Sequence, residues 1–93
     1  MDIEYDHNKD AINLFKHGIS LREAARIDWG TLWAIEDHRH DHGEIRMIGL
    51  GLLETRLFCV IYTDKYSDRG SVRRVISLRK TNKREVKSYV LSN

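Results

Sequence analysis

The sequence lacks the features on which several common enzyme and membrane classes depend. It has no proline, a single cysteine, and neither a glycine-rich phosphate loop, a paired-cysteine motif, zinc-finger spacing nor a serine nucleophile elbow. No stretch approaches the ~18 consecutive apolar residues that span a membrane. These absences exclude hydrolytic and nucleotide-triphosphate chemistry of the kinds that use such motifs. The single cysteine, Cys59, lies in an apolar run, so we expect a small core residue rather than a catalytic or redox one.

The length of 93 residues allows one domain, spanning residues 1–93, because independent domains need at least ~50 residues each. A chain of this size does not enclose a deep cofactor cavity, so we expect no cofactor. Its first residues are acidic and polar, whereas a signal peptide is basic and then apolar. We therefore expect a soluble protein that stays in the cytoplasm and contacts no membrane.

The first third of the chain predicts a short strand and two helices. Residues 2–6 alternate between acidic and apolar side chains, as in a strand with one buried face. Helical spacing of apolar residues follows at 8–17, and Gly18 supplies the left-handed stop. A capping box that begins at Ser20 starts a second helix, which Gly30 closes. The apolar sides expected to face the core are Ala11, Leu14 and Phe15 in the first helix and Leu21, Ala24, Ala25 and Ile27 in the second.

The rest of the chain predicts four strands and a last helix. Four segments have the length and the branched or aromatic content of strands: residues 31–36, 44–51, 56–63 and 71–78. The third of these is nearly continuously apolar, so we place it centrally with both faces covered. A helix follows over 81–93, with Val86, Tyr89 and Val90 facing inward. The predicted fold class is α+β: an antiparallel β-sheet meander packed with two N-terminal helices and one C-terminal helix.

Charge is distributed unevenly along the chain. Residues 1–53 carry six lysines and arginines against ten acidic residues, whereas residues 54–93 carry ten against four. The cations are densest across the predicted last strand and helix: Arg73, Arg74, Arg79, Lys80, Lys83, Arg84 and Lys87. Such a surface attracts polyanions. A solvated surface that happens to be basic would show the same pattern.

Two neighbouring arginines are informative because side chains alternate along a strand. Arg73 and Arg74 must point to opposite sides, so one of them points inward or over a sheet edge. A guanidinium in that position is costly unless it meets a carboxylate or a bound phosphate. Glu44 and Arg46, two residues apart on a neighbouring predicted strand, are candidates for the same constellation. A purely structural ion-pair network accounts for these residues equally well.

Histidines suggest two further candidate sites. His17 follows Lys16 at the end of the first predicted helix, where cations meet the negative end of the helix dipole. His17 is equally suited to transfer a proton near neutral pH. A loop holds alternating histidines beside carboxylates: His38, His40 and His42 with Asp37, Asp41 and Glu44. Zinc sites normally draw their ligands from separated, rigid elements, so we expect this single exposed hairpin to hold no required metal.

A larger pattern emerges when the residues are taken in order along almost the whole chain. Its members are Tyr5, Asp6, Lys9, Asn13, Lys16, His17, Gly18, Ala24, Asp37, His42, Glu44, Arg46, Gly49, Tyr62, Thr63, the run RVISLRK at 74–80, Glu85 and Tyr89. This pattern resembles the BrnT family, the toxin component of type II toxin-antitoxin modules, with a RelE-like ribonuclease fold. The helix-end KHG and the RVISLRK strand carry most of the specificity.

The resemblance implies a metal-independent endoribonuclease that inhibits growth by cleaving RNA. RNA carries its own nucleophile, the 2′-hydroxyl, so the protein needs only to orient it, relay a proton and stabilise charge on the phosphate. The residues implied in catalysis are Arg74, Arg79, Arg46, His17, Tyr89 and Glu44. Those implied in RNA binding are Lys16, Arg73, Lys80, Lys83 and Arg84.

The resemblance also implies a partner. Members of the family are neutralised by a cognate antitoxin that typically carries a ribbon-helix-helix element and binds DNA, so the toxin meets DNA only through the complex. The alternative is a non-catalytic basic module that docks an acidic protein partner or nucleic acid. Expression of the chain alone separates the two, since only a toxin arrests growth and degrades RNA.

Overall fold

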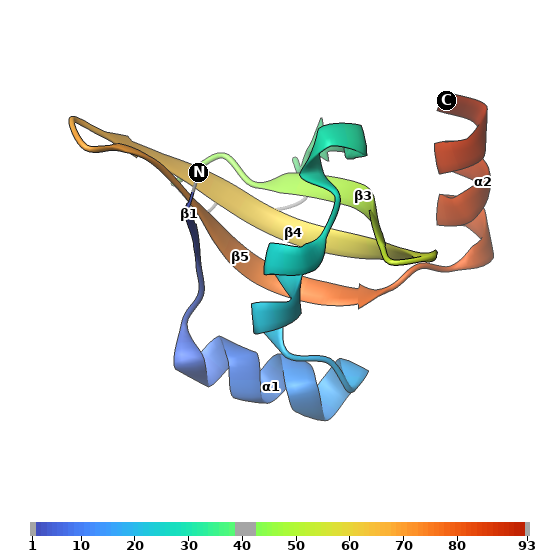
Figure 1. Ribbon diagram of the computed structural model, residues 1–93, viewed down its shortest axis with the longest axis horizontal. Helices are drawn as coiled ribbons and strands as arrows, with labels where there is room; N and C mark the ends of the chain where they lie inside the picture. Colours follow the sequence, from blue (N-terminus) through green and yellow to red (C-terminus); the bar gives the residue numbers. More distant parts are fainter. Residues whose placement is uncertain (1, 39–42, 93) are drawn as a thin grey trace.

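A computed structural model describes residues 2–38 and 43–92 of the chain. Its centre is a five-stranded sheet with the order β1-β5-β4-β3-β2 (Figure 1). The strands are β1 (Asp2–Glu4), β2 (Trp33–Glu36), β3 (Met47–Leu53), β4 (Arg56–Ser67) and β5 (Gly70–Lys80). The helices are α1 (His7–His17), the short 3-10 helices η1 (Leu21–Arg26) and η2 (Trp29–Thr31), and α2 (Lys83–Ser92). None of the described helices is long and apolar enough to cross a membrane.

The sheet is mixed, so the prediction of a wholly antiparallel sheet is wrong at its first strand. β2, β3, β4 and β5 pair antiparallel with their neighbours, but β1 pairs parallel with β5, from Asp2 opposite Val72 to Glu4 opposite Arg74. Alternating polarity identifies a strand without naming its partner, which explains the error. β4 and β5 also run beyond the predicted strand ends into a long projecting hairpin (Figure 1).

β4 is the central strand, as predicted, and both of its faces are covered. Leu57, Phe58, Cys59 and Val60 are consecutive and all are at most 8% exposed. On one face Phe58 and Val60 pack against buried residues of η1, including Leu21. On the other face Leu57 and Cys59 form a smaller cluster with Leu50 of β3. Cys59 is therefore a core residue, as its sequence context predicted.

The predicted second α-helix is wrong, because the segment forms two short 3-10 helices instead. Ser20 caps η1 as expected, with its hydroxyl accepting from the N–H of Arg22. Ile27 then takes an extended conformation and is only 5% exposed, and the Asp28 N–H donates to the Leu52 carbonyl of β3 at 2.8 Å. Because that N–H bonds to the sheet, it cannot continue a helical ladder. Contacts with the sheet thus override the local helical pattern.

α1 forms where the sequence predicts it, but its apolar side does not face the core. Leu14 is 52% exposed and Phe15 is 92% exposed, while Asn13 is the buried residue of this helix. The Asn13 amide nitrogen donates to the Leu78 carbonyl at 2.8 Å, and its oxygen accepts from the Leu78 N–H at 3.1 Å. β1 covers β5 only as far as Arg74, so Asn13 satisfies part of the remaining strand edge. A polar contact therefore sets the orientation of α1.

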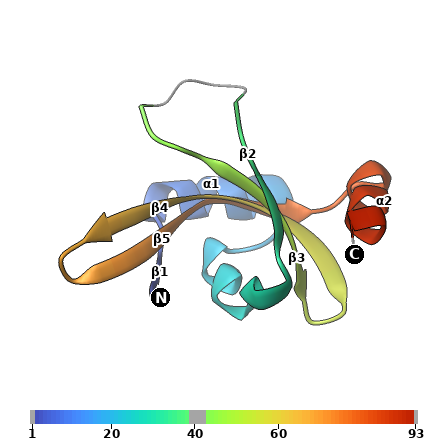
Figure 2. The ribbon, with the colours of Figure 1, turned by 90° about the horizontal axis from the view of Figure 1, so that it is seen from above.

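α2 also forms as predicted but packs less closely than its apolar stripe indicates. Val86 is 41% exposed and Val90 is 65% exposed, so the prediction that both face inward is wrong. Of the predicted stripe, Tyr89 packs against the cluster around Cys59. The helix stands at the end of β5, beside the sheet rather than across it (Figures 1 and 2).

Candidate functional site

Three of the candidate arginines lie on one face of the sheet. Arg79 and Arg74 pair with Cys59 and Thr63 of β4, which are four residues apart and therefore point to the same side. Arg46 directly precedes β3 and is level with Thr63 in the pairing of β3 with β4. This face is opposite to the one that η1 covers. We call it the arginine face.

A β-bulge brings Arg74 and Arg79 to the same side. The two residues are five apart, so in a regular strand their side chains would point to opposite faces. β5 pairs Ser77 with Ile61 but Val75 with Tyr62, and the extra residue between them shifts the alternation. The bulge therefore aligns two cations that a regular strand would separate.

Arg74 is positioned by the first strand. Its Nη2 donates to the Glu4 carboxylate at 3.1 Å, across the parallel pairing of β1 and β5. Its Nε is enclosed and has no hydrogen-bond partner among the described residues. An enclosed guanidinium donor is costly unless an acceptor reaches it, and phosphate oxygens match its geometry. Arg74 thus has one terminal nitrogen held by Glu4, and its enclosed Nε meets an anion only if the side chain moves.

Arg46 lies beside Glu44, as the sequence suggested. The Arg46 Nε is 3.6 Å from a Glu44 carboxylate oxygen, and the Arg46 side chain is 22% exposed. The Thr63 hydroxyl donates to the Ile45 carbonyl at 2.7 Å, which fixes the intervening backbone against β4. This arrangement suits Glu44 to orient Arg46 rather than to act as a base.

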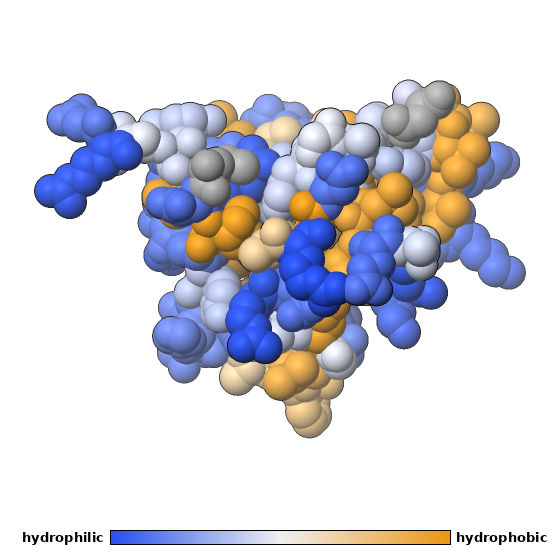
Figure 3. All heavy atoms as spheres, in the orientation of Figure 1, coloured by the Kyte–Doolittle hydropathy of each residue, from blue (hydrophilic) through white to orange (hydrophobic). Residues whose placement is uncertain are grey.

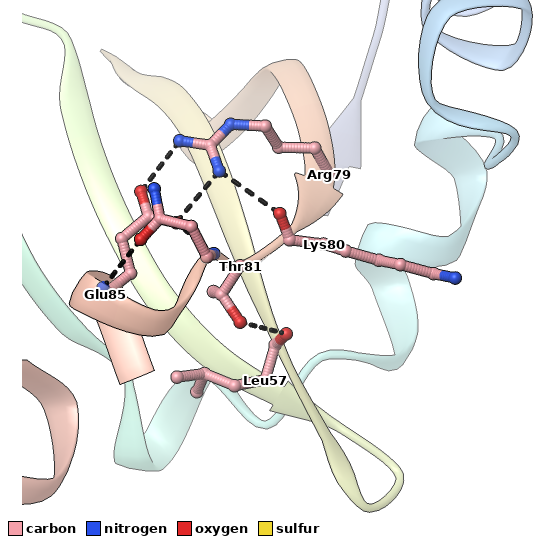
Figure 4. A network of polar contacts seen from close by, with 6 residues as sticks. Leu57, Arg79, Lys80, Thr81 and Glu85 are labelled. Atoms are coloured by element: carbon pink, nitrogen blue, oxygen red, sulfur yellow. Dashed lines mark hydrogen bonds and ion pairs between the residues drawn. The ribbon is translucent and has the colours of Figure 1, made fainter. Parts of the chain in front are cut away.

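Arg79 is held by the first turn of α2. Both of its terminal nitrogens donate to the Glu85 carboxylate, at 2.9 and 2.7 Å, and Nη1 also donates to the Lys80 carbonyl (Figure 4). Glu85 forms a reciprocal capping box with Asn82, with bonds of 3.0 and 2.8 Å. The hydrogen bonds from Arg79 lower the pKa of Glu85, and those to Glu85 raise the pKa of Arg79. Glu85 is thus ionised and orients the guanidinium of Arg79.

Lys16 and His17 lie beside the arginine face. α1 ends at His17 because Gly18 adopts a left-handed conformation, with φ of 71°. A shallow groove of about 150 Å³ between α1 and β5 is lined by both residues together with Ser77. Ser77 pairs with Ile61, which lies on the same side of β4 as Cys59, so it belongs to the arginine face between Arg74 and Arg79. The fold therefore joins the end of α1 to the arginine face.

Other predicted site residues lie elsewhere. Arg73 is on the opposite face, where it makes two hydrogen bonds to Asp64, at 2.7 and 2.9 Å, and lies over the rings of Trp29 and Tyr62 at 4.8 and 4.2 Å. Its side chain is 16% exposed, and its hydrogen bonds to Asp64 raise its pKa. The structural alternative of an ion-pair network therefore describes Arg73.

Tyr89 and three basic residues complete the predicted set. The Tyr89 ring packs on the Cys59 cluster, and its hydroxyl donates to the Thr31 carbonyl at 3.3 Å, so it docks α2 on the fold. Lys80 points away from Arg79 (Figure 4), and Lys83 and Arg84 are exposed in the first turn of α2. The structure does not bring these four side chains together with Arg74.

Sequence reasoning missed two neighbours of the arginines. Glu4 holds Arg74, and Ser77 lies between Arg74 and Arg79 on the arginine face. Alternation with Ile3 places Glu4 on the face away from the main core, but no local signal pairs it with a residue 70 positions away. Ser77 shares a face with both arginines only because of the bulge.

Comparison with protein families gives this geometry its context. The family described as "Ribonuclease toxin, BrnT, of type II toxin-antitoxin system" matches residues 5–85 of the 93-residue chain. The chain belongs to the BrnT toxin family. Members of this family are described as ribonuclease toxins. Because they belong to type II toxin-antitoxin systems, a cognate antitoxin partner is implied. Comparison with curated proteins finds no match.

The BrnT match covers the whole arginine face. It extends from Tyr5 to Glu85 and so includes His17, Arg46 and both arginines of β5, whereas Tyr89 lies beyond it. The arginines of the face are therefore within the matched segment, whereas Glu4, which holds Arg74, lies just before it.

The histidine loop of this BrnT chain is described only in part. His38 is 79% exposed, with its Nε2 at 3.9 Å from a Glu36 oxygen, while His40, Asp41 and His42 lie outside the described residues. Within residues 2–38 and 43–92, no group of three or more histidine, cysteine or acidic side chains is arranged to hold a metal ion. The absence of a required metal stays a prediction.

Proposed function

We propose that this BrnT toxin is a metal-independent endoribonuclease that arrests growth by cleaving RNA in the cytoplasm, on a RelE-like fold. The observation that supports it best is the shared face of Arg46, Arg74 and Arg79, all partly exposed. Guanidinium groups match phosphate oxygens and stay charged at every physiological pH. Three of them on one face supply charged hydrogen-bond donors for the phosphate oxygens in phosphodiester cleavage.

The proposed reaction uses the nucleophile that RNA already contains. The 2′-hydroxyl oxygen attacks the adjacent phosphorus while a base accepts its proton, and the bond from phosphorus to the 5′-oxygen breaks. An acid returns a proton to that 5′-oxygen. The products are a 2′,3′-cyclic phosphate and a 5′-hydroxyl, so atoms and charge balance without another reactant.

In this scheme the arginines bind the phosphate group of the RNA. Arg74 and Arg79 bind its oxygens and stabilise the negative charge that develops in the transition state. Glu4 and Glu85 hold these two guanidinium groups in place. Arg46 adds a third cation from the start of β3, on the other side of β4 from β5, and Glu44 orients it.

Proton transfer is assigned to His17 in preference to Tyr89. His17 lines the groove with Ser77 beside the arginines, and histidine titrates near neutral pH. The Tyr89 hydroxyl already donates to the Thr31 carbonyl, and its ring docks α2. Lys16, Lys83 and Arg84 would guide RNA to the face, whereas Arg73 and Lys80 point to the opposite side.

The antitoxin is proposed to carry a ribbon-helix-helix element and to bind DNA, so that the toxin reaches DNA only through the complex. Family membership supports a protein antitoxin, because a type II system contains one. The ribbon-helix-helix element and DNA binding rest on the resemblance described above. The basic second half of the chain suits an acidic partner.

An assay of naked RNA tests the proposed function. The toxin is purified free of antitoxin and incubated with RNA in excess EDTA, and the ends of the fragments are analysed. We expect cleavage to persist and the fragments to end in 2′,3′-cyclic phosphate. Fragments with a 3′-hydroxyl, or activity that EDTA abolishes and one specific ion restores, would contradict the mechanism. Intact RNA and normal growth on expression would instead indicate a non-catalytic binding module.

A further inference from the structure

A groove separates α2 from the hairpin that joins β3 to β4. Its volume is about 580 Å³, and it lies at the end of β5, next to Arg79 and Glu85. Its apolar lining comes from Leu52 and Leu57 of the hairpin and from Val86, Tyr89 and Val90 of α2. A concave apolar surface of this size is suited to receive side chains of a partner.

The two valines that α2 contributes to the groove remain open to solvent. Val86 is 41% exposed and Val90 is 65% exposed, and no described residue of α2 is fully buried. In Figure 3 apolar and hydrophilic side chains lie next to each other over α2, at the right of the molecule. Contiguous exposed apolar surface with a polar rim is typical of an interaction site.

The rim of the groove is basic, which indicates the chemistry of its occupant. Arg56 and Lys83 line it, and Arg84 and Lys87 are exposed on the same helix. The carboxylate of nearby Glu54 is paired with Arg26, and within residues 2–38 and 43–92 none of the rim cations forms an ion pair with a carboxylate. A matching partner presents apolar anchors flanked by acidic residues. RNA is a poorer match, because its phosphates would face an apolar floor.

We propose that this groove binds an acidic, amphipathic segment of the cognate antitoxin. The inference rests on the proposed function, since the occupant is the partner of a toxin. A segment in the groove contacts α2, whose Glu85 holds Arg79, so binding there places the antitoxin at the border of the arginine face. The antitoxin then blocks RNA from the face without occupying the arginines themselves.

Charge substitutions in the groove test this proposal. Val86→Glu and Val90→Glu each add a carboxylate to the apolar lining at a partly exposed position, so both variants are expected to fold. Binding of the purified antitoxin of the same module is measured by titration calorimetry. We expect its Kd to rise at least ~30-fold, as for the loss of a central interface contact. Growth arrest should persist in both variants and no longer be relieved by co-expressed antitoxin.

Phe15→Glu is the matched control, because Phe15 is apolar, 92% exposed and on α1, away from the groove. It should leave antitoxin binding unchanged. Unchanged binding in both valine variants would overturn the proposal. So would a dimer of the wild-type chain that Val90→Glu dissociates, or a loss of RNA binding with antitoxin binding intact.

The two proposals fail separately in this experiment, because calorimetry needs no catalytic activity. A chain that does not cleave RNA but loses antitoxin binding in the valine variants would overturn the ribonuclease mechanism and support the groove. An active toxin whose valine variants bind antitoxin normally would overturn the groove alone.

Discussion

At the scale of single residues, the pair of Arg79 and Glu85 joins the arginine face to α2. Glu85 accepts hydrogen bonds from both terminal nitrogens of Arg79 and from the Asn82 N–H. The Glu85 carboxylate therefore caps α2 and also orients Arg79, which is proposed to bind phosphate. Loss of its charge should affect stability and activity together.

Glu85→Gln tests the contribution to stability through its pH dependence. The pKa of Glu85 is lowered from its ordinary value of 4.5, mainly by Arg79, so the ionised pair stabilises the fold above that pH. This stabilisation is lost as the pH falls through the lower pKa of the folded state. We expect the variant to be less stable by about 1–2 kcal/mol at pH 7 and the difference to shrink below pH ~4.5.

Urea denaturation of both proteins from pH 7 to pH 3 measures this effect. Equal stability of the two proteins at pH 7, or a difference that does not change with pH, would show that the ionised pair of Arg79 and Glu85 does not stabilise the fold.

The candidate residues could be named from the sequence, but the face of the sheet to which each side chain points could not. The resemblance to the BrnT family named Arg46, Arg74 and Arg79 as candidates, yet a five-residue spacing on one strand predicts opposite faces for the last two. The bulge that reverses this depends on how β5 pairs with β4. Arg73, which was predicted to bind RNA, lies over the rings of Trp29 and Tyr62. The sequence could not show this position, because these rings come from other parts of the chain.

At the scale of elements, α1 is attached to β5 through the Asn13 side chain, whose amide makes the two hydrogen bonds that a neighbouring strand would make. The Asn13 amide bonds to both backbone groups of Leu78, and its nitrogen also donates to the Ile19 carbonyl. The same attachment brings Lys16 and His17 to the arginine face. The contact thus connects the stability of the fold to the geometry of the site.

Asn13→Ala is expected to destabilise the protein by about 2–4 kcal/mol, because two buried backbone groups of Leu78 lose their partner. The neighbouring substitution Leu14→Ala is the control, since Leu14 is 52% exposed and should cost under ~1 kcal/mol. The free energy of unfolding in urea measures both. Equal losses in the two variants would refute a structural role for the amide.

Helix positions could be predicted from capping signals, but helix faces and lengths could not. The positions of α1 and α2 agree with their local patterns because Gly18 and the Asn82–Glu85 capping box act locally. The second helix was predicted too long, since the bond from Asp28 to the Leu52 carbonyl is a contact with the sheet. The apolar side of α1 faces outward because a buried amide decides its orientation.

At the scale of the whole molecule, the sheet separates the face that η1 covers from the arginine face. η1 packs on the first, and the arginine face lies between the cations at the end of α1 and the basic rim of α2. Residues 54–93 carry ten basic and four acidic side chains, so β5 and α2 supply most of this charge. The proposed antitoxin groove lies at the border of the arginine face, where α2 meets the end of β5.

The central claim is that the arginine face cleaves RNA, and the single-turnover cleavage rate of a double variant tests it most directly. Removing one charged donor aimed at a developing oxyanion typically costs ~10²–10³ in rate. We predict at least that loss for Arg74→Ala with Arg79→Ala, in protein that circular dichroism shows to be folded. The matched control, Arg22→Ala with Arg69→Ala, removes two exposed cations that lie away from the arginine face, one on η1 and one in the β4–β5 turn, and should cleave nearly as fast as the unmodified toxin. Cleavage by the arginine double variant at the unmodified rate would contradict the account.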